Sequence, residues 1–98
     1  MIYVAATFHI RPGSLEAFVA AAYVLIDAAR RVPGCIYYDL HASVTDPDRL
    51  FCFEHWADRA NLDIHLASPH TAAFGAAIAP LVTASKVEVI DPAHVEQL

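Results

Sequence analysis

The chain has 98 residues, no linker-like segment and no apolar run near the roughly 20 residues that cross a bilayer, so we expect one cytoplasmic domain over 1–98. Eleven Asp and Glu against six Lys and Arg give a net charge of −5, which argues against nucleic acid and anionic membrane as partners. Two cysteines without CxxC spacing are too few for a disulfide framework, and we interpret them as buried, reduced thiols.

Residues 2–10 alternate between two faces as a strand does, and Arg11-Pro12-Gly13 ends the pattern. The members of one face are Ile2, Val4, Ala6, Phe8 and Ile10. Ser14 is expected to cap a helix that ends at Pro33-Gly34. The apolar stripe predicted for that helix is Leu15, Phe18, Val19, Ala22, Ile26 and Ala29.

A second strand is predicted at 35–43, with turn residues at 45–48 and a returning strand at 49–56. The inward members of the second strand are expected to be Ile36, Tyr38, Leu40 and Ala42. Asp58 should cap a short helix at about 59–67, and Ser68-Pro69 should start another that runs to about 80. The segment 85–90 closes the chain as a fourth strand.

This order, β-α-β-β-α(α)-β, predicts an α+β, ferredoxin-like fold with a four-stranded antiparallel sheet and helices on one face. The second face then has no helix to cover it. The hydrophobic fraction of 57% exceeds the roughly 45–50% typical of soluble domains. Pairing of two sheets would bury that face, so we expect a homodimer.

Three of the six histidines fall in 53–70, FEHWADRANLDIHLASPH. Helical spacing places His65 on the inward stripe with two leucines. His70 lies in the first turn of the next helix, where the unpaired N–H groups and the dipole disfavour an imidazolium, so we expect it to be neutral and inward. The inward stripe predicted for this helix is His70, Phe74, Ala77, Ile78 and Leu81. In the preceding strand, Glu54 and Trp56 share one face and His55 takes the other.

Each of these side chains also has a structural interpretation. An inward histidine is commonly a hydrogen-bonded core residue. Glu54 alone suggests a solvated or structural carboxylate, and Trp56 and Phe74 suggest core aromatics. A metal site is disfavoured, since the spacing of His65 and His70 matches neither HxxxH nor HExxH. No G-x-S-x-G motif or phosphate loop is present.

The stretch 53–74, FEHWADRANLDIHLASPHTAAF, resembles the signature of the antibiotic biosynthesis monooxygenase superfamily. In that signature a strand with E-x-W or E-x-Y precedes a helix ending in H, then S/T-P-H and an aromatic residue. VAATFHIRPGSLEAF at 4–18 resembles the family's first strand and helix entry. The resemblance implies a dimeric α+β barrel, with a substrate cavity between each sheet and its own helices. Its matching positions are Glu54, Trp56, His65, His70 and Phe74.

Cofactor-free relatives within this resemblance oxidise electron-rich phenolic rings with O₂. A base in a dry pocket suffices, because a deprotonated phenol can itself pass an electron to O₂. We therefore expect a monooxygenase without metal or cofactor, acting on a small aromatic or quinone-like substrate. The candidate catalytic residues are His65, His70 and Glu54, with either histidine as the base. The candidate substrate-binding residues are Trp56, Phe74 and Phe8.

Two other branches of the superfamily share part of this resemblance. The haem-degrading branch places a tryptophan where this chain has His65, and its haem-ligating histidine falls near Gly75, so it fits less well. An isomerase branch shares the paired histidines and the "PH" element. Isomerisation of a small keto or sugar-phosphate substrate therefore stays open, as does a non-catalytic binding or stress-response module that uses the same cavity.

Overall fold

A computed structural model describes residues 1–98 and builds four strands and three helices in the expected order. The strands pair antiparallel in the order β2-β3-β1-β4. This confirms the α+β, ferredoxin-like fold. The elements are β1 (Ile2–Ile10), α1 (Leu15–Ala29), β2 (Cys35–Ala42), β3 (Arg49–Trp56), α2 (Arg59–Leu66), α3 (Pro69–Ile78) and β4 (Val82–Ile90).

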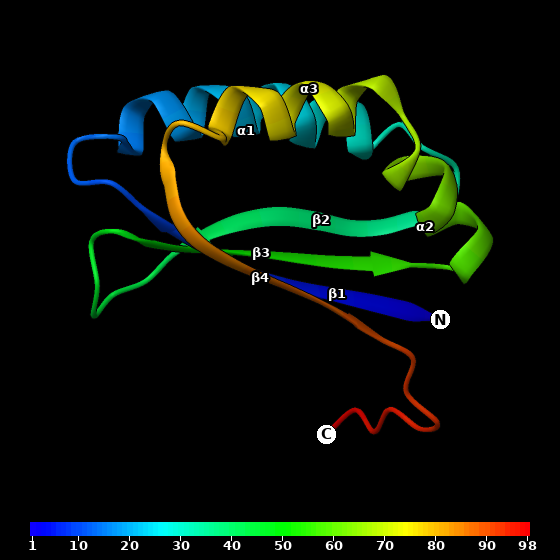
Figure 1. The fold of residues 1–98 in the computed structure, drawn as a ribbon. Helices are drawn as coiled ribbons and strands as arrows, with labels where there is room; N and C mark the ends of the chain where they lie inside the picture. Colours follow the sequence, from blue (N-terminus) through cyan, green and yellow to red (C-terminus); the bar gives the residue numbers. More distant parts are fainter.

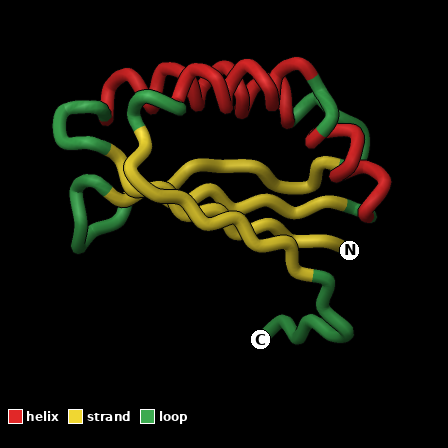
Figure 2. Tube along the Cα trace, in the orientation of Figure 1, coloured by secondary structure: helices red, strands yellow, loops and turns green.

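The helices lie over one face of the sheet, with α1 and α3 side by side and α2 at one end (Figures 1 and 2). Burial along β1 alternates strictly, which confirms the predicted face. The largest fully buried side chains are Trp56, Phe18 and Leu62, from a strand and two helices. The core therefore lies between the sheet and its helices, where the candidate functional residues also lie.

The predicted stripe of α1 is partly wrong. Leu15 is 44% exposed, whereas Leu25, which was not predicted, is buried. Leu25 faces α3 as well as the sheet, so its burial depends on a helix pair that a single stripe does not describe. Ser14 is the N-cap residue, but its side chain makes no capping hydrogen bond.

The predicted inward face of β2 is also partly wrong. The register shifts between Cys35 and Tyr37, so Cys35 pairs with Trp56 and Ile36 is exposed. A bulge of this kind adds one residue and interrupts the two-residue alternation. Beyond it Tyr38 is buried as predicted, but Leu40 is half-buried and Ala42 is exposed.

The short helices begin as expected. The Asp58 carboxylate accepts a hydrogen bond from the Asn61 N–H, so it caps α2. Pro69 occupies the first turn of α3, where a missing N–H costs no helical hydrogen bond. β4 begins at Val82, three residues before the predicted strand at 85.

The second face of the sheet carries no helix (Figure 1). Aromatic rings cover its middle: Phe53 lies 5.6 Å from Tyr3, 6.2 Å from Phe51 and 6.0 Å from Tyr37 between ring centroids. His55 stacks on Tyr3 at 4.2 Å, and its buried Nε2 has no hydrogen-bond partner. We call these five side chains the open aromatic face.

Residues 91–98 follow β4 away from the sheet without forming a helix or strand (Figure 1). Both cysteines are free; Cys52 is buried and Cys35 is half-buried. No helix has the length and apolar character needed to traverse a bilayer.

Candidate functional site

An inner cavity of about 130 Å³ lies between the sheet and its helices. Of its 14 lining residues, 11 are hydrophobic, so a ligand there would be surrounded mostly by apolar side chains. The exceptions are Glu54 from β3, His65 from α2 and Thr71 from α3. No Lys or Arg lines it.

Glu54 faces the helices because it alternates with Phe53 and His55 along β3. It is only 6% exposed, so the interpretation of a solvated carboxylate is wrong. Trp56 Nε1 donates a hydrogen bond to Glu54 Oε1 at 3.0 Å. Burial raises the pKa of Glu54 to about 7, against the opposing effect of the Trp56 hydrogen bond. The carboxyl group can therefore gain or lose a proton near neutral pH.

His65 is 2% exposed, which confirms the inward direction predicted from helical spacing. Its ring stacks on Trp56 at 4.9 Å and meets the edge of Tyr38 at 5.3 Å. Its Nε2 lies 3.8 Å from Glu54 Oε1. Burial, and secondly the neighbouring His70, lower the pKa of His65 to about 4. His65 is therefore neutral at neutral pH.

His70 reaches the site only through His65. Its Nε2 lies 3.0 Å from His65 Nδ1 and 2.8 Å from Ser68 Oγ. The ring is half-buried and lines a separate hollow of about 200 Å³ between α1 and α3. The predicted inward stripe of α3 is thus partly wrong, since only Ile78 is buried and Ala77 is exposed. α3 packs beside α1 and so covers little of the sheet by itself.

Two of the three aromatic candidates line the inner cavity. Phe8 and Phe74 do so from the sheet and from α3, with their rings edge to face at 6.2 Å. Trp56 is fully buried and is absent from the cavity wall. It contacts Glu54 and His65 from behind, so its position favours holding those two side chains over binding a substrate.

The sequence interpretation did not include Tyr38 and Cys52 among the site residues, although both line the cavity with Glu54. Tyr38 pairs with Glu54 across the strands, and Cys52 precedes Glu54 by two residues on the same face. Burial raises the pKa of both groups, that of Cys52 to about 12, so neither ionises near neutral pH. The two-residue alternation was the signal that could have found them.

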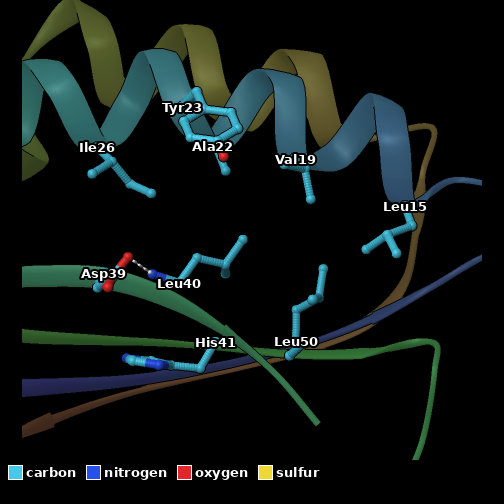
Figure 3. A pocket seen from close by; sticks show the side chains of 10 residues that line it. Leu15, Val19, Ala22, Tyr23, Ile26, Asp39, Leu40, His41 and Leu50 are labelled. Carbon is cyan, nitrogen blue, oxygen red and sulfur yellow. Dashed lines mark hydrogen bonds between the residues drawn. The ribbon is translucent and has the colours of Figure 1, made fainter.

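A larger outer cavity of about 250 Å³ lies between α1 and the β2 side of the sheet. Figure 3 shows Leu15, Val19 and Ile26 projecting from α1 toward Leu40 and Leu50. It shares Ala22, Ile26 and Leu40 with the inner cavity. The outer cavity contains no buried ionisable group, so the inner cavity is the candidate site for chemistry.

Nowhere in the chain do three or more His, Cys, Asp or Glu side chains gather in a way that could hold a metal ion. Glu54, His65 and His70 form a line in place of a ring of converging ligands, because His65 lies between the other two. What the arrangement offers is a carboxyl group and an imidazole beside an apolar space. Such a pair can move protons to and from a bound molecule.

A family model described as "Antibiotic biosynthesis monooxygenase" matches residues 1–77. The matched range includes every candidate site residue: Phe8, Glu54, Trp56, His65, His70 and Phe74.

Known structures resemble the whole chain. Rv0793 from Mycobacterium tuberculosis is 32% identical, with a TM-score of 0.88 and 98% of each chain covered. A crystal structure named antibiotic biosynthesis monooxygenase is 29% identical, with a TM-score of 0.87, over 96% of this chain and 100% of its own. The Synechocystis protein sll1783 is 35% identical over 69 residues, which is 70% of this chain. That match covers 47% of the Synechocystis protein, so the chain spans about half of this curated relative.

Proposed function

The chain belongs to the antibiotic biosynthesis monooxygenase family, and on that premise we propose that it is a cofactor-independent monooxygenase. Its substrate is a small electron-rich aromatic molecule, such as a hydroquinone, bound in the inner cavity. The observation that carries the proposal is the pair formed by Glu54 and His65, which are both buried and face one apolar cavity.

The reaction begins with proton removal. A hydroxyl group of the substrate gives its proton to a side chain of the pair, and the resulting phenolate is a strong electron donor toward O₂. The apolar wall supports this step, because the exclusion of water limits side reactions of the reactive intermediates. The overall balance is one hydroquinone and one O₂ giving one hydroxylated quinone and one water. The substrate supplies all four electrons, so no other reductant is required.

Each candidate residue has a place in this proposal. Glu54 and His65 hold and move the proton, and His70 supports His65 from outside the cavity. Phe8 and Phe74 provide flat apolar surfaces for an aromatic ring. Trp56 orients the Glu54 carboxylate through its N–H. The outer cavity, which shares three lining residues with the inner one, is the proposed entry path.

An isomerase of a small keto or sugar-phosphate substrate is the second candidate, because a carboxyl group and an imidazole can shuttle a proton between carbon and oxygen. A phosphate group would need positive charge, and the inner cavity has no Lys or Arg. This absence favours an uncharged aromatic substrate. A binding module would use the same cavity without turnover.

We also propose that the protein is a homodimer formed through the open aromatic face. Phe51 and Tyr37 on that face are more than a third exposed in the single chain. Burial of apolar area is the main driving force of such association.

Oxygen uptake with a panel of hydroquinones tests the monooxygenase proposal. Enzyme-dependent uptake together with an oxygenated product supports it. Binding without uptake indicates the binding module, and O₂-independent turnover of a small keto or sugar-phosphate substrate, tested in parallel, indicates the isomerase.

A further inference from the structure

The hydrogen bonds around His65 determine which of its two ring nitrogens carries the proton. The relevant atoms are His65 Nδ1, His70 Nε2, Ser68 Oγ and the carbonyl oxygen of His65. Ser68 Oγ donates its single hydrogen to the His65 carbonyl, and Thr71 Oγ1 donates to the same carbonyl at 2.6 Å. With that hydrogen used, Ser68 Oγ can only accept from His70 Nε2, 2.8 Å away. His70 Nε2 must therefore carry a hydrogen.

The same hydrogen, shared between Ser68 Oγ and His65 Nδ1 in a three-centre hydrogen bond, accounts for the contact between the two imidazoles. His70 Nε2 lies 3.0 Å from His65 Nδ1. A hydrogen on His70 Nε2 makes His65 Nδ1 an acceptor. The opposite assignment, with the hydrogen on His65 Nδ1, leaves the lone pair of His70 Nε2 facing that of Ser68 Oγ. Turning the Ser68 hydroxyl toward His70 does not repair this, because two donors would then share one nitrogen lone pair.

We propose that Ser68 is a positioning residue that holds His65 in the tautomer protonated at Nε2. His65 then presents an N–H group to the cavity, on the side where Nε2 lies 3.8 Å from Glu54 Oε1. A neutral imidazole in this tautomer has its lone pair on Nδ1, where His70 occupies it. It donates to a substrate oxygen and does not accept a proton from it.

This inference rests on the proposed function and deepens it by dividing the roles of the pair. Glu54 is the group that accepts the substrate proton, and His65 Nε2–H stabilises the phenolate oxygen that forms. The sequence interpretation had assigned the base to a histidine. The hydroxyl of Ser68, which that interpretation treated as part of a helix start and of the S/T-P-H signature, decides otherwise.

Two-bond ¹⁵N–¹H NMR of the histidine rings in the full-length protein reads the tautomer without any substrate. The expected spectrum has His65 protonated at Nε2 and unprotonated at Nδ1. A proton on Nδ1 of His65 in the wild-type protein would overturn the proposal, whatever the variants do.

Ser68→Ala removes the constraint, and the Nδ1-protonated form of His65 should then appear beside the first. Ser68→Thr keeps the hydroxyl and should restore the single wild-type form. His9 and His94, which lie far from Ser68 in the sequence and outside this hydrogen-bond network, serve as controls in the same spectra. An unchanged His65 signal in Ser68→Ala contradicts the role of Ser68. The NMR result does not depend on the proposed oxygenase activity, because the tautomer is measured without substrate. A protein without that activity could therefore still show the expected tautomer.

Discussion

Glu54 Oε1 and His65 Nε2 lie 3.8 Å apart, and both side chains are buried. The contact is an ion pair only if His65 is protonated, and burial opposes that by lowering the pKa of His65 to about 4. Burial also raises the pKa of Glu54 to about 7. Near neutral pH the pair is therefore a neutral imidazole beside a carboxyl group that is partly ionised. A carboxylate in this range can act as a base and still release its proton afterwards.

Trp56→Phe should move the pH dependence of the reaction. The wild-type profile of kcat/KM should rise with an apparent pKa near 7, the value of Glu54. The Trp56 N–H stabilises the carboxylate, so its removal should raise the pKa of Glu54 and shift the rising limb to higher pH. The substrate should be a hydroquinone, because its hydroxyl group ionises near pH 10 as that of tyrosine does. Its own titration then lies well above the rising limb.

Phe74→Leu is the matched control for Trp56→Phe, since Phe74 lines the cavity and makes no hydrogen bond to Glu54. It should change the KM and leave the limb in place. A limb that stays fixed or moves to lower pH in Trp56→Phe would show that Glu54 is not the titrating group.

Glu54→Gln should stabilise the protein at high pH. The folded-state pKa of Glu54 is raised, so the wild-type protein loses stability as pH rises from about 4.5 to about 7. Glutamine has no such charge and can still accept from Trp56. The variant should therefore gain about 2–3 kcal/mol relative to wild type between pH 5 and pH 8. Urea denaturation at the two pH values measures this difference.

The lowered pKa of His65 gives stability the opposite pH dependence. Its effect is that the folded protein loses stability as pH falls from about 6.5 to about 4. The two groups should largely offset each other in wild type, whose stability should change little between pH 5 and pH 8. In Glu54→Gln only the histidine effect remains, so stability should fall toward pH 5. If the free energy of unfolding changed with pH in the same way for wild type and Glu54→Gln, Glu54 would not be a buried carboxyl group that titrates in this range.

His65→Ala should reduce kcat/KM more than His70→Ala does. His65 lines the cavity, whereas His70 contacts only His65 and Ser68 there. Loss of a direct donor typically costs about 10²–10³ in rate. Each variant should also lose about 1–3 kcal/mol of stability, because a buried partner is left unpaired. Rates are therefore compared per folded molecule, from unfolding curves of the same samples.

His9→Ala is the control, because His9 lies on the opposite face of the sheet from Glu54. It should leave the rate per folded molecule close to wild type. A larger loss of kcat/KM in His70→Ala than in His65→Ala would contradict the proposed arrangement, in which His65 lies between Glu54 and His70.

The sequence predicted the order of elements and the direction of His65, because strand alternation and helical spacing depend on near neighbours. It did not predict that Glu54 is buried. Alternation places Glu54 on the helix side of β3, but the packing of the helices over that face, α2 with His65 among them, decides whether water reaches that position. A carboxyl group surrounded by apolar side chains is a property of the assembled layers.

The remaining differences have the same origin. His70 turns toward a hollow between two helices, and Ile36 is displaced by a bulge. The hydroxyl groups of Ser68 and Thr71 meet the carbonyl of His65 at the corner between α2 and α3. The angle of that corner depends on contacts that are distant in sequence. The family resemblance included Glu54, His65 and His70, but it left open which of them would be the base in the proposed reaction.

Phe53→Glu should convert a dimer into a monomer. Phe53 lies in the middle of the open aromatic face, in contact with three other rings, and a charge there would be buried without a partner in the proposed interface. Ile64→Glu is the control, because Ile64 is 57% exposed on α2. Sedimentation should give a dimer for wild type and Ile64→Glu. A stable wild-type monomer at micromolar concentration would contradict the proposed interface.

Oxygen uptake by chelator-treated wild type and Glu54→Gln, measured with the same hydroquinone, shows whether Glu54 supports an oxidation that needs no cofactor. Elemental analysis and the visible spectrum first verify that neither sample carries metal, flavin or haem. Wild type should show steady uptake and form a hydroxylated quinone, and a folded Glu54→Gln should have a kcat/KM lower by about 10²–10⁴. Equal rates for the two proteins, or wild-type uptake that appears only when metal, flavin or haem is added back, would contradict the proposed function.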